Sequence, residues 1–363
     1  MVSPARRPCA APLLATRSGA VARAYSSPVE RFPVIVGPTA GGKSDLALAL
    51  ARELARRRRA PTPAHAVQIV SADAFQVYKG MDIGTAKATA DQRSLVQHHL
   101  IDVCEPSASF SVDRWRTQAI NAIDRIQASG ATPIVVGGTL LYVMALLEGL
   151  FDGPGADDAF RASAAGASTE SLRAQLVRAD PRTAGRLHPN DRRRTIRALE
   201  VLRLTGRSLT DLQEQWDRGA RRPDTLLVVL NWSREAINRR INARVKRMLE
   251  SGFVDEVRGL MDTGSLSQQA AAAIGYRDVM EHLAGKITLE DAAERIKQAT
   301  RRLGKHQRSW LRRLLAGASK GTAIVVDADS EPMDHWPAIV ADALESAPSP
   351  RASVPGPTPH DAR

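Results

Sequence analysis

Cysteine is scarce in this sequence, and its scarcity excludes two common ways of stabilising a fold. Among 363 residues there are 2 cysteines, Cys9 and Cys104, which lie far apart in the chain. Two cysteines cannot build a disulfide framework or complete a four-cysteine zinc site. The sequence therefore predicts a protein of a reducing compartment without a structural metal.

Long hydrophobic runs are lacking as well. A helix that crosses a bilayer needs about 18 to 20 consecutive apolar residues, and charged residues interrupt every hydrophobic segment of this chain. With 43% hydrophobic residues the chain still has enough apolar material for one large core, or for a core with a smaller appendage. We expect no membrane partner.

Acidic residues are in the minority. Lys and Arg number 51 against 39 Asp and Glu, which gives a formal net charge of +12. Such a balance favours a polyanionic partner, nucleic acid above all. The alternative is that the charge only keeps the surface solvated, and composition alone does not decide between the two.

Both ends of the chain have compositions that do not suit a packed fold. Residues 1–29 are rich in Arg, Ala and Ser and contain no acidic residue, which is typical of an organellar transit peptide or of an unstructured extension. We favour an extension over residues 1–30 and expect a cytoplasmic protein, with the mitochondrion or plastid as the alternative. Residues 346–363 combine prolines with small polar residues and are predicted to be a disordered tail.

Between these ends, short β-branched runs alternate with longer helical patterns, which predicts a parallel sheet flanked by helices. A Gly- and Asp-rich stretch follows residue 151 and opens a segment that reads as helical without strands. The predicted domains are a first part of the core at 31–152, an inserted all-helical domain at 153–223, and a second part of the core at 224–331 that carries basic helices. The expected strands are 33–36, 67–70, 100–103, 133–136, 225–230 and 323–326.

A phosphate-binding motif directly follows the first expected strand. It matches the pattern G-x-x-x-x-G-K-[ST] and precedes an amphipathic run, which is the strand, loop and helix context that the motif requires. The glycines let backbone N–H groups point inward, and the helix N-terminus adds its positive dipole. The motif indicates an α/β fold of the P-loop NTPase type, with a phosphate site formed by Gly37, Pro38, Thr39, Ala40, Gly41, Gly42, Lys43 and Ser44.

A carboxylate follows the second expected strand. Asp73 stands at the carboxyl end of that strand, at the edge where open α/β sheets bind their ligands. Taken alone, Asp73 is equally consistent with a helix cap or with a group near a bound Mg²⁺. The surrounding segment, 71–87, narrows the choice because it belongs to a recognisable set of sequence blocks.

Together these blocks resemble the tRNA isopentenyltransferases, also called tRNA dimethylallyltransferases. The similarity extends over about residues 32–313 and keeps the family's order of blocks. The sequence shows no C-terminal zinc finger of the kind that eukaryotic relatives often add, which indicates the bacterial type. Besides 37–44 and 71–78, the matching blocks are 98–102, 137–142, 196–201, 273–277 and 300–310.

The resemblance implies that the protein transfers a dimethylallyl group from dimethylallyl diphosphate to N6 of the adenine next to the anticodon in tRNA. The loop, Lys43 and a Mg²⁺ ion on Ser44 would neutralise the departing diphosphate, so no nucleoside triphosphate is required. Asp73 matches the family's residue that accepts the proton of the amine or orients it. Thr39 matches a loop residue at the reacting end, although simple loop packing would also explain it. A monomer is expected.

The resemblance also implies that the target adenine leaves the anticodon loop and enters a channel through the core. The helical domain at 153–223 would then bind the anticodon stem-loop. By motif position, the residues implied on the tRNA side are Asp73, Ala74, Phe75, Gln76, Thr139, Arg161, Arg193, Arg194, Thr195, Ile196 and Arg197.

Three other interpretations stay open on sequence alone. An enzyme that prenylates a free adenine nucleotide would share every catalytic block, but this interpretation does not account for the basic helical domain. A small-molecule P-loop kinase explains the phosphate loop and little else, and an RNA-binding protein with a residual nucleotide site does not explain why Lys43, Ser44 and Asp73 are intact. The basic segment 301–313 is expected to face either RNA or solvent.

Overall fold

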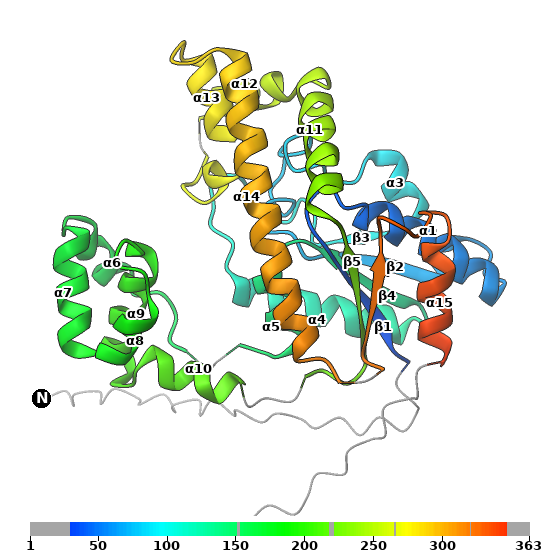
Figure 1. Cartoon of the computed structure of the whole chain (residues 1–363), viewed down its shortest axis with the longest axis horizontal. Helices are drawn as coiled ribbons and strands as arrows, with labels where there is room; N and C mark the ends of the chain where they lie inside the picture. Colours follow the sequence, from blue (N-terminus) through cyan, green and yellow to red (C-terminus); the bar gives the residue numbers. More distant parts are fainter. Residues whose placement is uncertain (1–29, 151–152, 218–220, 265, 320, 347–363) are drawn as a thin grey trace, which may run out of the picture.

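The computed structural model describes residues 30–150, 153–217, 221–264, 266–319 and 321–346. Its centre is a six-stranded parallel sheet in the order β3-β2-β4-β1-β5-β6 (Figure 1). This arrangement confirms the predicted α/β class with a parallel sheet. The strands are β1 (Phe32–Val36), β2 (Val67–Ser71), β3 (His98–His99), β4 (Thr132–Gly137), β5 (Thr225–Asn231) and β6 (Ala323–Asp327).

Helices cover both faces of the sheet because the central strands are apolar on both sides. On β1, Val34 packs into one core together with α4 (Val112–Ala128) and α5 (Leu140–Leu147). Its neighbour Ile35 points to the opposite face and packs with α1 (Lys43–Arg58) and α15 (Trp336–Ser346). The result is a three-layer sandwich in which α1 and α15 lie side by side.

Five helices stand between α5 and β5, and the described residues of this segment contain no strand. They surround a small core of their own that includes Leu172, Leu176 and Val201, and α6 to α9 lie to one side of the sheet (Figure 1). Side-chain caps at Asp157, Ser168 and other positions mark where these helices begin. The helices are α6 (Asp158–Ala165), α7 (Thr169–Ala179), α8 (Pro181–Arg186), α9 (Arg192–Thr205) and α10 (Leu209–Asp217).

A second group of helices follows β5 and includes the longest helix among the described residues, α14 (Leu289–Ala316). Figure 1 shows α14 running from the tip formed by α12 and α13 down to the sheet. The basic segment 301–313 lies toward the C-terminal end of this helix, and Gln307 and Leu311 are buried residues within it. The others are α11 (Arg234–Glu250), α12 (Phe253–Asp262), the 3₁₀ turn η1 (Ala270–Ala272) and α13 (Tyr276–Leu283), while α2 (Pro63–Ala66) and α3 (Ala90–Leu95) precede β2 and β3.

One predicted strand is wrong. The expected strand at 100–103 does not form, because β3 ends at His99 and the backbone of Leu100 and Asp102 turns into the left-handed region with φ of 63° and 55°. The Asp102 carboxylate is used in ion pairs with Lys87 and Arg93, and these contacts favour a turn over a longer edge strand. The predictions for residues 1–29 and 347–363 lie outside the described residues, and Ser346 itself ends α15.

Candidate active site

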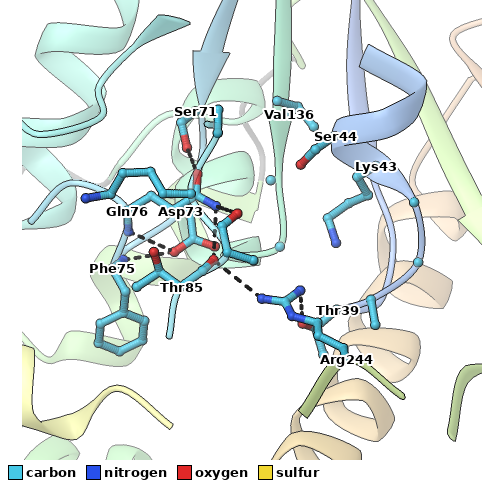
Figure 2. A pocket seen from close by; sticks show the side chains of 18 of the residues that line it. Thr39, Lys43, Ser44, Ser71, Asp73, Phe75, Gln76, Thr85, Val136 and Arg244 are labelled. Atoms are coloured by element: carbon cyan, nitrogen blue, oxygen red, sulfur yellow. Dashed lines mark hydrogen bonds between the residues drawn. The ribbon is translucent and has the colours of Figure 1, made fainter. Parts of the chain in front are cut away.

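A cavity of about 1530 Å³ opens at the carboxyl edge of the sheet. Its walls come from the loop after β1, the loop after β2, the Gly137 to Leu141 segment after β4, and the helices α11 and α14. In Figure 2, Asp73 lies on one side of this space and Lys43 on the other, with Arg244 near Thr39. The structure therefore brings the expected catalytic residues Thr39, Lys43 and Asp73 to one site.

The phosphate loop has the geometry of an anion site. Ala40 and Gly42 adopt φ of 61° and 83°, which curls the loop around the start of α1. No side chain caps that helix, so its first backbone N–H groups are free to receive an anion. The Lys43 ammonium donates to the carbonyls of Gly37 and Pro38 at 3.1 and 2.8 Å, and the exposed Ser44 follows it at the helix start.

The Lys43 ammonium lies in an environment that disfavours its charge. Burial and the neighbouring Arg244 guanidinium lower the pKa of Lys43 to about 8, although the Asp73 carboxylate acts in the opposite direction. Burial likewise lowers the pKa of Arg244, again against the attraction of Asp73. Two cations face a single carboxylate, so this end of the cavity has an excess of positive charge that suits an anionic ligand.

The loop after β2 holds Asp73 in a fixed orientation. One carboxylate oxygen of Asp73, Oδ1, accepts hydrogen bonds from the backbone N–H groups of Phe75 and Gln76 at 2.9 and 3.3 Å. The Thr139 hydroxyl accepts a bond from the N–H of Ala74 at 2.9 Å, which ties this loop to the segment after β4. The second oxygen, Oδ2, accepts no protein hydrogen bond among those of the described residues, and it is therefore available to a substrate.

Two further residues of the site were not identified from the sequence. Arg244 on α11 contacts the Thr39 hydroxyl and the Thr85 carbonyl at 3.4 Å each. Gln307 on α14 accepts a bond from the Thr39 N–H at 2.8 Å and donates to the Gly138 carbonyl at 2.9 Å. Gln307 thereby joins the phosphate loop to the segment after β4. Its place in the matching block 300–310 marks the position as one shared with the family, but it does not indicate this contact.

The predicted RNA contacts of the helical segment do not line the cavity. Arg161 binds the fully buried Glu200 carboxylate through two bonds of 2.7 and 3.0 Å, and Arg197 pairs with the same carboxylate. Both arginines thus already have a structural partner. Arg193 and Arg194 are exposed, Ile196 is half-buried, and Thr195 is fully buried, so the Thr195 side chain is not accessible to an RNA.

Comparison with known proteins places these features in a family. Residues 76–314 match the family model for IPP transferases. A tRNA dimethylallyltransferase of Geobacter sulfurreducens is 43% identical over 289 residues, which cover 78% of this chain and 89% of the relative. One from Methylococcus capsulatus is 43% identical over 300 residues, covering 79% and 91%.

Solved structures agree with the sequence comparisons. The tRNA isopentenylpyrophosphate transferase of Bacillus halodurans matches with a TM-score of 0.59 and 35% identity, over 87% of this chain and 97% of that one. A eukaryotic dimethylallyltransferase captured while acting on tRNA matches with a TM-score of 0.72 and 28% identity, over 89% of this chain and 81% of that one.

Proposed function

Since this chain belongs to the IPP transferase family, we propose that the cavity between Lys43 and Asp73 is where it performs the family's reaction. The protein transfers a dimethylallyl group from dimethylallyl diphosphate to N6 of the adenine next to the anticodon in tRNA. One observation supports this assignment of the site. The phosphate loop with its Lys43 ammonium and the oriented Asp73 carboxylate face each other across one cavity.

The phosphate loop binds the diphosphate of the donor. As the bond between the allylic carbon and its oxygen breaks, negative charge grows on the diphosphate, and groups already aimed at those oxygens stabilise it. The N–H groups at the start of α1, the Lys43 ammonium and the Arg244 guanidinium supply this stabilisation. Arg244 contacts Thr39, so it reaches the same end of the cavity as the loop.

Asp73 serves the acceptor. The exocyclic nitrogen of adenine forms a bond to the allylic carbon and then carries an extra proton, which the free Oδ2 of Asp73 accepts. The fixed bonds to Oδ1 keep the other oxygen pointed into the cavity. Thr139 and Gln76 belong to the same wall, and we assign them with Ala74 and Phe75 to the side that holds the flipped adenine.

Mg²⁺ is the proposed cofactor, and the donor set is consistent with it. The described residues contain no cluster of three or more acidic, histidine or cysteine side chains able to hold a metal, so the protein offers no cage of its own. Mg²⁺ commonly binds through one or two protein oxygens and the phosphates of a substrate. The Ser44 hydroxyl would hold the ion, which when bound would neutralise part of the diphosphate charge.

The helical segment α6 to α10 and the basic face of α14 are proposed to contact the tRNA. Arg193 and Arg194 on α9 are exposed, as are several basic residues of α14. Among the described helices none has the length and apolar character needed to cross a bilayer. The bacterial relatives support action in the cytoplasm, and the monomeric state stays a prediction.

The test is transfer of labelled dimethylallyl from its diphosphate, with Mg²⁺, to unmodified tRNA or to AMP. We expect label in tRNA, and a loss of about 100-fold or more in Asp73→Asn, which keeps the size and one acceptor but cannot take the proton. Asp113→Asn, an exposed carboxylate at the start of α4 that does not line the cavity, is the matched control and should retain activity. Label in AMP alone would mean that the acceptor is a free nucleotide, and full activity of Asp73→Asn would remove Asp73 from the mechanism.

A further inference from the structure

A short loop, 82–87, forms part of the cavity wall and touches both halves of the proposed site. Its Thr85 and Ala86 carbonyls accept hydrogen bonds from the Gln76 amide at 3.3 and 3.4 Å. The Thr85 carbonyl also accepts a bond from Arg244 at 3.4 Å. Figure 2 shows Thr85 between Gln76 and Arg244. The loop thus contacts both the acceptor-side amide of Gln76 and the donor-side guanidinium of Arg244.

The loop is held from outside the cavity by a single carboxylate. Glu256 on α12 accepts hydrogen bonds from three consecutive backbone N–H groups, those of Asp82, Ile83 and Gly84, at 2.8, 2.5 and 3.1 Å. The Tyr276 hydroxyl donates to the same carboxylate at 2.7 Å. A negative charge surrounded by four donors matches the way in which a bound anion sits in a nest of N–H groups.

Packing leaves this attachment little freedom. A Cβ atom on Gly84 would lie 2.4 Å from the Phe253 ring and 2.6 Å from the Tyr276 ring, so the loop backbone rests directly on these two aromatic side chains. At its other end, the fully buried Lys87 ammonium binds the Asp82 and Asp102 carboxylates at 2.6 Å each. The loop is therefore a rigid piece fixed at both ends, and Glu256 fixes the end next to Thr85.

We propose that Glu256 is a positioning residue for prenyl transfer: through the 82–87 loop it sets where Arg244 and Gln76 stand relative to the two substrates. The inference rests on the proposed function, because it assigns Arg244 to the diphosphate and Gln76 to the adenine. Replacing the carboxylate with an amide removes the acceptor of at least one of the three loop N–H groups, because the two oxygens share these bonds. The loop then reorganises, and a misplacement of about 1 Å at a reacting group lowers the rate by up to about 100-fold.

The first experiment compares Glu256→Gln with Glu250→Gln in steady-state transfer to tRNA. Glutamine keeps the size and one acceptor oxygen, but an NH₂ group takes the place of the other oxygen and cannot accept the loop N–H bonds made there. We expect kcat/KM to fall by about 10-fold or more in Glu256→Gln, with a higher KM for dimethylallyl diphosphate. Glu250 is an exposed residue of α11 that pairs with Lys246 and does not line the cavity, and its variant should behave as the wild type.

A double-mutant cycle separates positioning from a general loss of stability. If Glu256 acts through Arg244, adding Glu256→Gln to Arg244→Lys costs much less than it costs in the wild type. Multiplicative effects in this cycle, or wild-type kinetics of Glu256→Gln, would overturn the proposal. Activity retained in both Arg244→Lys and Asp73→Asn would instead overturn the assignment of the site itself.

Tyr276→Phe provides a variant that keeps the loop attached. It removes one of the four donors to Glu256 and leaves the three backbone bonds, so it should fold even if Glu256→Gln does not. We expect a fall in kcat/KM of about 2- to 5-fold that also becomes smaller when Arg244→Lys is present. No change in Tyr276→Phe, alone or in the cycle, would count against the proposal.

Discussion

Lys43 shows how a single residue can be tuned by its surroundings. Its ammonium has no carboxylate in hydrogen-bonding contact among the described residues and instead donates to two loop carbonyls, close to the Arg244 guanidinium. This arrangement favours binding of an anion at the free site, because a bound diphosphate relieves the repulsion between the two cations. The same arrangement makes binding sensitive to alkaline pH.

We predict that the affinity for dimethylallyl diphosphate falls above pH 8. With a pKa of about 8 in the free protein, Lys43 is charged below that pH and loses its proton above it, whereas the bound anion restores the ordinary pKa. Binding above pH 8 therefore takes up a proton, and Kd should rise roughly 30-fold between pH 7 and about pH 9.5. Titration calorimetry in two buffers of different ionisation heat measures both the Kd and the number of protons taken up on binding.

Lys43→Arg is the control for this prediction. A guanidinium stays charged throughout the range, so the variant should bind more weakly at neutral pH but with an affinity that hardly changes up to about pH 9.5. A Kd that rises equally in both proteins would assign the titration to another group.

At the scale of elements, two glycines differ in how closely the neighbouring atoms approach their backbone. Gly137 ends β4, and a Cβ there would lie 2.1 Å from the Ala72 carbonyl oxygen, a backbone atom that cannot turn aside. Gly259 lies within α12 with no atom within 4 Å of its added Cβ. Gly137 is therefore required by the close approach of β4 to the residue that follows β2, whereas Gly259 is not required by any such contact.

Alanine at these two positions should change stability in opposite directions. Gly137→Ala forces the strands apart and should lower the free energy of unfolding by about 3 kcal/mol. Gly259→Ala should raise it by about 0.5 to 1 kcal/mol, because alanine loses less backbone entropy in a helix. Urea unfolding followed by circular dichroism gives both values, and equal effects of the two substitutions would contradict the packing described for β4.

Elements of the core could be predicted because their signals are local. The runs that become β1, β2, β4, β5 and β6 are short, apolar and β-branched, and the phosphate loop is contiguous in sequence. The predicted strand at 100–103 was wrong, because a local apolar pattern contains no information about the ion pair between Asp102 and Lys87. Arg244, Gln307 and Glu256 could not be found, since their partners lie far away in sequence, 268 residues in the case of Gln307 and Thr39.

At the scale of the whole molecule, the protein has two kinds of core. The sheet and its helices share large apolar clusters, while α6 to α10 enclose a small one. At the centre of the small unit, the buried Glu200 carboxylate is held by Arg161 and Arg197. Burial opposes its ionisation, but these hydrogen bonds outweigh that effect and hold the pKa of Glu200 below its ordinary value.

We predict that Glu200→Ala unfolds the helical unit and leaves the sheet folded. Glu200 is buried, but its partners Arg161 and Arg197 are 47% and 31% exposed, so removing the carboxylate costs about 1 to 3 kcal/mol. That is still a large share of the stability of so small a core. Limited proteolysis should cut the variant within 153–217, and dimethylallyl diphosphate should still bind. Because the folded pKa is depressed, the contribution of Glu200 is present above its unfolded pKa and is lost as the pH falls through the folded value.

A variant with wild-type resistance to protease would show that the helical unit does not depend on this carboxylate. Loss of donor binding would show that the two units fold as one. Glu170→Ala, an exposed carboxylate on α7, is the control within the same unit.

The strand order has a consequence for synthesis on the ribosome. β1 pairs with β5 in a register that begins with Phe32 opposite Thr225. The edge of β1 that faces β5 therefore stays unpaired while the whole helical unit is being translated. The helical unit has a core of its own, so we expect it to fold before β5 completes the sheet. Gln307 is made later still, so the phosphate loop gains this partner only after β5 and α11 have been synthesised.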